Sequence, residues 1–181
     1  MKRHVALLRG VNVGRAKRIA MADLRKILAG LGYLNVRTLL NSGNAVFDAR
    51  TGSPEAHAQN IRAALFKELD VDAKVVAKSA TEFARAVAEI PMLQGEKDPS
   101  RFLVVFTQQS STLAALAPLS KATWFPEALA VGRNAAYMWC PGGIVESKVA
   151  QAVNRALGEN ATARNWSTVL KLGELLKEDG A

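Results

Sequence analysis

The amino-acid sequence predicts an α/β protein (α+β) of two βαββαβ lobes, each a four-stranded antiparallel sheet with helices on one face. Three observations predict this fold. Apolar residues recur at helical spacing in some segments, and apolar runs of strand length lie between them. Turns rich in asparagine and glycine divide two pairs of short strands. The order strand, helix, strand, strand, helix, strand is complete by residue 78 and starts again near residue 101.

The composition is that of a folded protein. Of the 181 residues, 49% are hydrophobic and 22% are charged, which excludes the composition of a disordered chain. A chain of this length buries about 70% of its unfolded surface, so it can form a core without disulfide bonds. From the element order we expect a basic first lobe at residues 1–78, a linking helix and loop at 79–100, and a second lobe with a C-terminal helix at 101–181.

The first lobe begins with an apolar strand that a glycine-rich loop ends, because glycine readily adopts positive φ. A helix follows, with Gly32 placed as its C-terminal cap. The turn at 41–44 then separates the two strands of a hairpin. The expected elements are a strand at 4–9, a helix at 21–31, strands at 36–40 and 45–49, a helix at 55–69 and a strand at 73–77.

Ser79 and Glu82 have the spacing of a capping box, which predicts a linking helix at 80–90 that Pro91 ends. A polar loop through Gly95 leads to the second lobe. The elements expected there are a strand at 102–107, a short helix at 111–119, hairpin strands at 128–131 and 135–140, a helix at 147–157, an edge strand at 161–164 and a last helix at 168–177.

The βαββαβ order also predicts which loops meet. The first and third strands lie side by side and antiparallel at the centre of such a sheet, which gives the strand order 4-1-3-2. The loop at 9–14 and the turn at 41–44 should therefore emerge at the same end of the first sheet.

Positive charge is concentrated in the first lobe. The net charge is +8, from 24 Lys and Arg against 16 Asp and Glu. Residues 1–78 hold 14 basic and 6 acidic residues, whereas residues 79–181 hold 10 of each. Such a cluster attracts anions, so an anionic ligand or nucleic-acid phosphate is the partner that we expect.

The candidate site of the first lobe combines loop backbone, amides and cations. Glycines after a strand can turn N–H groups towards an anion, and the following helix N-terminus assists them. The alternative is that the glycines only make a tight connection and that the polar turn only joins two strands. The candidate residues are Arg9, Gly10, Asn12, Gly14, Arg15, Lys17, Arg18, Ser42, Gly43 and Asn44.

A second candidate set lies near the C-terminus. Arg164, Asn165 and Trp166 combine a cation, an amide and an aromatic ring, which together can hold a carboxylate, a phosphate or a base. Ser147 and Lys148 begin a predicted helix and could bind an anion there. The structural alternative is that Trp166 anchors the last helix, Ser167 caps that helix and Arg164 lies along the surface.

Groups for catalysis are sparse, so the catalytic residues stay unassigned and we expect no metal and no cofactor. We expect His4 and His57 to be surface or edge residues rather than bases. Cys140 is the single cysteine, which excludes an internal disulfide and favours a small buried side chain. No apolar run is long enough to span a membrane, so we expect a cytoplasmic protein without a membrane partner.

A family resemblance is carried by the segments at 6–14, 21–24, 31–32, 42–44, 147–148 and 162–169. In these segments the sequence resembles the bacterial family called domain of unknown function 1697. It implies two ferredoxin-like plaits and no established activity. Arg15 stands where a glycine is frequent in that family, which makes this loop more basic than the family's pattern.

The leading hypothesis is an anion-binding protein that acts through the basic loop site of its first lobe. One alternative is an enzyme on a small phosphorylated or carboxylated substrate. The other is a structural or oligomerising module. The predicted central strands of the first lobe, at 4–9 and 45–49, offer Phe47 as their one aromatic side chain, which disfavours base stacking on that sheet.

Overall fold

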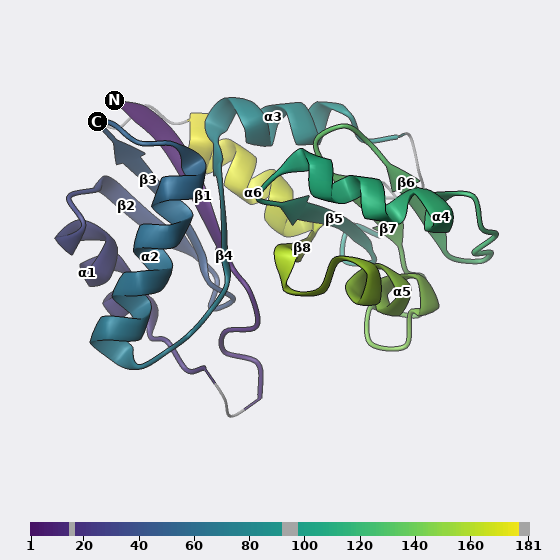
Figure 1. Ribbon diagram of the computed structural model, residues 1–181, viewed down its shortest axis with the longest axis horizontal. Coiled ribbons are helices and arrows are strands. Elements are labelled where there is room, and N and C mark those ends of the chain that lie inside the picture. Colours follow the sequence, from purple (N-terminus) through teal and green to yellow (C-terminus); the bar gives the residue numbers. More distant parts are fainter. Residues whose placement is uncertain (15–16, 92–97, 178–181) are drawn as a thin grey trace. The chain divides into compact units, whose positions relative to one another are not determined.

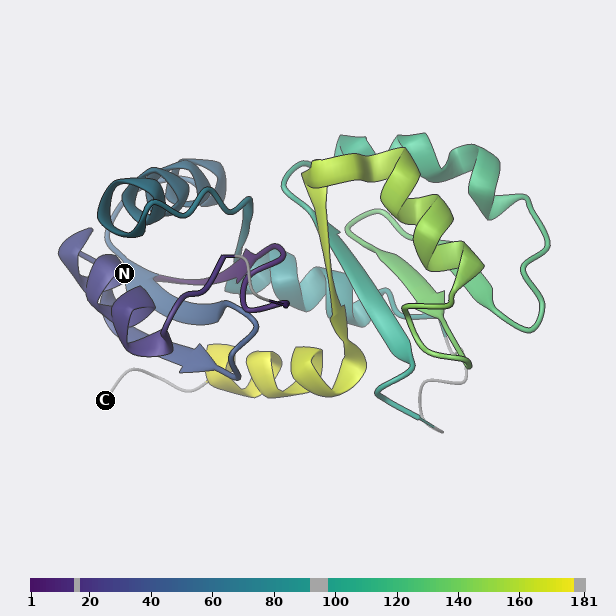
Figure 2. The ribbon, with the colours of Figure 1, turned by 90° about the horizontal axis from the view of Figure 1, so that it is seen from below.

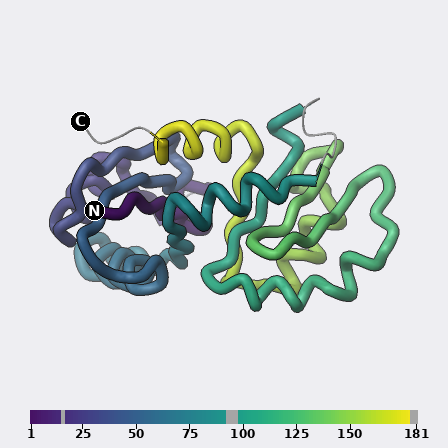
Figure 3. Tube along the Cα trace, turned by 90° about the horizontal axis from the view of Figure 1, so that it is seen from above, coloured from purple at the N-terminus to yellow at the C-terminus, as the bar shows by residue number. Residues whose placement is uncertain are grey.

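The computed structural model describes residues 1–14, 17–91 and 98–177. Arg15 and the predicted loop through Gly95 lie outside the described residues. The chain divides into two compact units, whose residues can be followed in Figure 3 by the colour bar. The first unit comprises Met1–Phe83 and the segment that begins at Lys171, and the second comprises Ala84–Leu170. The lobe bounds expected from the sequence remain a prediction.

The first unit contains a four-stranded antiparallel sheet in the order β2-β3-β1-β4 (Figure 1). This is the predicted order 4-1-3-2 seen from its other edge, so the prediction is confirmed. The strands are β1 (Lys2–Leu8), β2 (Leu34–Leu39), β3 (Asn44–Ala49) and β4 (Val75–Ser79).

Helices α1 (Met21–Gly30) and α2 (Pro54–Leu69) cover one face of this sheet, as Figure 1 shows. Every second residue of the central strands points to them, because side chains alternate between the faces of a strand. Leu8 and Phe47 on the sheet pack in one buried cluster with Leu24 of α1 and Ile61 of α2.

The second unit repeats the arrangement with a sheet in the order β6-β7-β5-β8. Figure 2 shows helical segments over one face of this sheet, where Val105 and Met138 pack with Leu113 and Val153. The elements are β5 (Phe102–Thr107), the 3₁₀ segment η2 (Ser110–Leu116), α4 (Ala117–Ser120), β6 (Ala128–Val131), β7 (Ala136–Trp139), α5 (Lys148–Leu157), the 3₁₀ turn η3 (Gly158–Asn160) and β8 (Ala161–Asn165).

Two further helices complete the described fold. The helix α3 (Ala80–Ala88) follows β4 directly, and the predicted capping box is present. The Glu82 carboxylate accepts from the Ser79 backbone N–H at 2.8 Å, and Ser79 Oγ accepts from the Glu82 N–H at 3.2 Å. The last helix is α6 (Trp166–Lys177). Within the described residues, none of the helices has the length and apolarity needed to cross a membrane.

The prediction that both histidines are surface or edge residues is wrong. His4 and His57 are 2% and 3% exposed, and their ring centroids are 4.6 Å apart. Strand alternation places His4 on the helix-covered face, where the His57 ring of α2 meets it. The His57 ring is also edge-on to the stacked rings of Tyr33 and Phe47. The Tyr33 hydroxyl and His57 Nδ1 share a hydrogen bond of 2.9 Å.

Burial keeps both rings neutral. Desolvation, assisted by the neighbouring His57, lowers the pKa of His4 to about 4, and desolvation also lowers the pKa of His57. Within the described residues, His4 Nδ1 and His57 Nε2 have no hydrogen-bond partner that would offset a positive charge.

We predict that the protein loses stability as the pH falls from about 6.5 to about 4. Over this range His4 gains a proton in the unfolded chain but not in the folded one, and the lowered pKa of His57 acts in the same direction, so the stability present at neutral pH declines. For His4 the loss is about 1.4 kcal/mol per pH unit. Urea unfolding at about pH 7, about pH 5.5 and about pH 4.5 measures it. His4→Phe should flatten the dependence, and a constant free energy of unfolding would contradict the prediction.

Candidate functional site

Three connections converge at one end of the first sheet. The Leu8 N–H donates to the carbonyl of Gly43 at 2.8 Å, which joins the end of β1 to the β2–β3 turn. The Arg9 N–H donates to the carbonyl of Lys74 at 2.8 Å, which joins the same loop to the α2–β4 connection. The expectation that the loop at 9–14 meets the turn at 41–44 is confirmed.

Asn12 holds the β1–α1 loop in shape. Its backbone has a φ of 58°, in the left-handed region that asparagine tolerates better than most residues. Its side-chain amide donates to the carbonyls of Ile19 at 2.8 Å and Asn41 at 2.6 Å, while its Oδ1 accepts from the Ile19 N–H at 2.9 Å. The amide is therefore used to connect the loop and the turn.

The β2–β3 turn is closely packed against this loop. A Cβ on Gly43, which has a φ of +77°, would lie 2.6 Å from Val11 Cγ2 and 2.7 Å from Leu8 Cβ. Asn44 is fully buried, and its amide donates to Ser42 Oγ and to the carbonyl of Leu39, both at 2.9 Å. Glycine and asparagine therefore serve the packing of the turn.

The cationic side chains at this end of the sheet differ in their exposure to solvent. Lys17 and Arg18 are exposed, and Arg9 and Lys74 are half-buried. A carboxylate in this region is Asp72, whose pKa the hydrogen-bonded Arg62 lowers first, with the nearby Lys17 and Lys74 adding to the effect. The Arg62 Nε lies 2.6 Å from an Asp72 oxygen. The loop end thus carries exposed positive charge beside a carboxylate that Arg62 pairs. The exposed loop residues Gly10 and Gly14 complete the predicted set that the structure describes.

Sequence reasoning missed Lys74, Asp72 and Arg62. The signal that could have found them is the topology itself. Because β4 runs antiparallel to β1, the residues before β4 must lie where β1 ends.

Ser147 and Lys148 lie at the start of α5 in the second unit. Ser147 Oγ accepts from the Ala150 N–H at 3.0 Å, so it caps the helix, and Glu127 accepts from the Val149 N–H at 2.9 Å. The protein's own carboxylate thus occupies the position that an anion would take at this N-terminus. Lys148 is exposed.

Arg164, Asn165 and Trp166 follow one another where β8 passes into α6. Arg164 is buried, which lowers the pKa of its guanidinium to about 10, and it donates to Thr162 Oγ1 at 2.7 Å. Asn165 Oδ1 accepts from the Thr168 N–H at 3.0 Å and so caps α6. The Trp166 ring packs edge-on against Phe102, with centroids 6.2 Å apart. The contact of Trp166 agrees with the structural alternative. The rest of that alternative is wrong, because Asn165 rather than Ser167 caps the helix and Arg164 is buried rather than at the surface.

The remaining candidate chemistry is limited in the described part of the chain. Cys140 is buried, as expected, and burial raises the pKa of its thiol. Residues 1–14, 17–91 and 98–177 contain no group of three or more His, Cys, Asp and Glu side chains that could hold a metal ion.

The family assignment rests on the sequence. Residues 1–137 match the family described as "Protein of unknown function (DUF1697)", and the chain belongs to this family. No curated protein matches the sequence.

A solved structure has a similar fold. The conserved bacterial protein SP0830 from Streptococcus pneumoniae superposes with a TM-score of 0.79 and 21% sequence identity. The match covers 97% of this chain and 99% of that chain, so the likeness extends over both units.

The contacts of Gly43 generate a stability prediction. Gly43→Ala adds a methyl group against Val11 and Leu8 and also strains a positive φ, so it should lower the free energy of unfolding by about 3 kcal/mol. Gly14→Ala is the matched control. Its φ is +62° and a Cβ there meets nothing within 4 Å, so strain alone should cost about 1 kcal/mol. Urea unfolding of both variants measures the difference. Equal losses of unfolding free energy would show that the close approach of Gly43 to Val11 and Leu8 does not affect stability.

Proposed function

We propose that this member of the DUF1697 family binds a polyanion, such as the phosphate backbone of a nucleic acid, at the loop end of its first sheet. The observation that carries the proposal is the exposure of Lys17 and Arg18 on a loop that Asn12 fixes to its neighbours. Lys74 and Arg9 add positive charge beside them.

The amide side chains at the loop end bind within the protein whereas the cationic ones are exposed, and this contrast supports a charge-based contact. The amides of Asn12 and Asn44 are engaged within the protein, so they are poorly placed to recognise a small substrate by shape. Exposed lysine and arginine contact phosphates without reading sequence. This pattern favours a polyanion over the alternative of an enzyme on a small phosphorylated or carboxylated substrate.

The expected location of the protein belongs to the same proposal. We propose a cytoplasmic location, on the ground of the single cysteine. A structural or oligomerising module stays an alternative hypothesis.

A salt titration of the full-length protein on a random DNA duplex tests the proposal. Each phosphate contact should contribute about −0.9 to the slope of log affinity against log salt. Lys17→Ala combined with Arg18→Ala should weaken binding to all sequences alike and flatten that slope by about one unit or more. Fluorescence anisotropy measures both quantities.

The matched control is Lys121→Ala combined with Arg133→Ala, which removes two exposed cations from the second unit. This variant should bind the duplex as the parent protein does. Binding that is insensitive to salt, or that the two double variants reduce equally, would refute a specific electrostatic contact at the loop end.

A further inference from the structure

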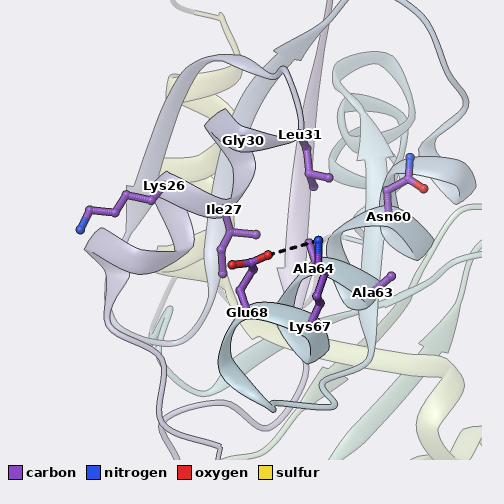
Figure 4. Close-up of a pocket in the computed structure, with 9 residues that line it drawn as sticks. All are labelled: Lys26, Ile27, Gly30, Leu31, Asn60, Ala63, Ala64, Lys67 and Glu68. Atoms are coloured by element: carbon purple, nitrogen blue, oxygen red, sulfur yellow. Dashed lines mark ion pairs between the residues drawn. The ribbon is translucent and has the colours of Figure 1, made fainter.

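A groove of about 560 Å³ runs along the outer side of the first unit, between α1 and α2 (Figure 4). We propose that this groove binds a small amphipathic anion, a molecule with an elongated apolar body and one carboxylate or similar group at its end. The proposal is independent of the polyanion site, because it uses the helix pair and not the loop end of the sheet.

The groove exists because the facing helix positions carry small side chains. Gly30 on α1 faces Ala63 and Ala64 on α2, and a Cβ added to Gly30 would meet nothing within 4 Å. The space that larger residues would fill stays open, and its volume lies in the usual range of about 300–1,000 Å³ for small-molecule sites.

The floor of the groove is apolar. Ile27 and Leu31 are partly buried and pack with the core cluster of the first unit. The floor therefore rests on a fixed surface, which can take up an aliphatic chain without rearrangement of the core.

The rim of the groove favours a negative ligand. Lys26 and Lys67 line it together with one acidic residue, Glu68. Figure 4 shows the head groups of Lys67 and Glu68 directed towards each other at the groove, whereas Lys26 points outwards from α1. Lys67 Nζ lies 3.8 Å from the nearer Glu68 oxygen, and these side chains are 83% and 56% exposed.

Such a long and exposed ion pair stabilises little. A ligand carboxylate can therefore replace Glu68 as the partner of Lys67, while the flexible Lys26 side chain can turn towards the same charge. Two cations against one carboxylate make an anion the better complement than an amine.

Decanoate is the probe, titrated into the isotope-labelled full-length protein below its micelle concentration. Amide NMR shifts should be largest in α1 and α2. Decanol, which lacks the charge, and decyltrimethylammonium, which reverses it, should each bind at least tenfold more weakly. Shifts confined to residues 9–14 would place the anion at the loop end and overturn the groove proposal without affecting the polyanion site.

Two kinds of variant separate shape from charge. Ala63→Leu fills the groove from an exposed position, with Ala64→Leu as a second filling variant, and either should weaken decanoate at least tenfold while a thermal melt shows a folded protein. Lys67→Glu should reverse the preference between decanoate and decyltrimethylammonium. Lys121→Glu, on the second unit, is the matched control and should change neither affinity.

Three outcomes would overturn the proposal. They are an absence of saturable shifts in the two helices, affinity that survives both filling variants, and binding of an acidic amphipathic peptide in this groove in place of decanoate. The last outcome would assign the groove to a protein partner.

Discussion

The pairing of β1 on both of its edges is the constraint on which the first unit depends. Ala6 lies opposite Ala45 of β3 on one side and opposite Ala77 of β4 on the other, and both pairings are antiparallel. The residues from Val5 to Leu8 are fully buried. Because both neighbours run against β1, the chain must leave β1 where β3 and β4 begin. The convergence of the three connections is thus a consequence of topology.

At that end of the sheet the amide side chains stabilise the fold, whereas the charged side chains are exposed to solvent. A buried amide without a partner is costly, so the buried Asn44 stabilises the turn because its amide donates to a carbonyl and a hydroxyl. The half-buried Asn12 stabilises the loop because its amide donates to two backbone carbonyls. Lys17 and Arg18 remain in water and add little to stability there. Their charge is nevertheless held in place by the loop that Asn12 shapes. The affinity of such a cationic surface for an anion depends on the density of positive charge more than on the identity of the ligand.

Much of the fold could be predicted from the sequence because periodicity and turn residues agree with each other. Helix α2 and the strands β5 and β6 lie almost where the apolar pattern places them. The burial of His4 could not be predicted, since a polar residue at the start of a strand fits an exposed edge equally well until its neighbours are known. His57 and Tyr33 supply that environment from distant parts of the chain.

The candidate site was only partly predictable for a related reason. Residue types identify groups that can bind an anion, but not whether the protein itself satisfies them. Ser147 and Asn165 have suitable side chains, yet they cap the helices α5 and α6. Asp72 and Lys74 gave no local signal, because only the pairing of β4 with β1 brings them to the loop end.

In the second unit, which has the same topology, one of the protein's own carboxylates occupies the corresponding end of the sheet. Its β6–β7 hairpin occupies the position that the β2–β3 turn has in the first unit, since β7 pairs with β5 as β3 pairs with β1. There the Glu89 carboxylate accepts hydrogen bonds from the backbone and the side-chain amide of Asn134. The protein supplies its own anion to that hairpin, and residues 79–181 have as many acidic as basic residues. The fold alone therefore assigns no ligand to this end of a sheet. The two units differ in their side chains. The excess of basic over acidic residues in the first 78 residues favours the first unit as the one that binds an anion.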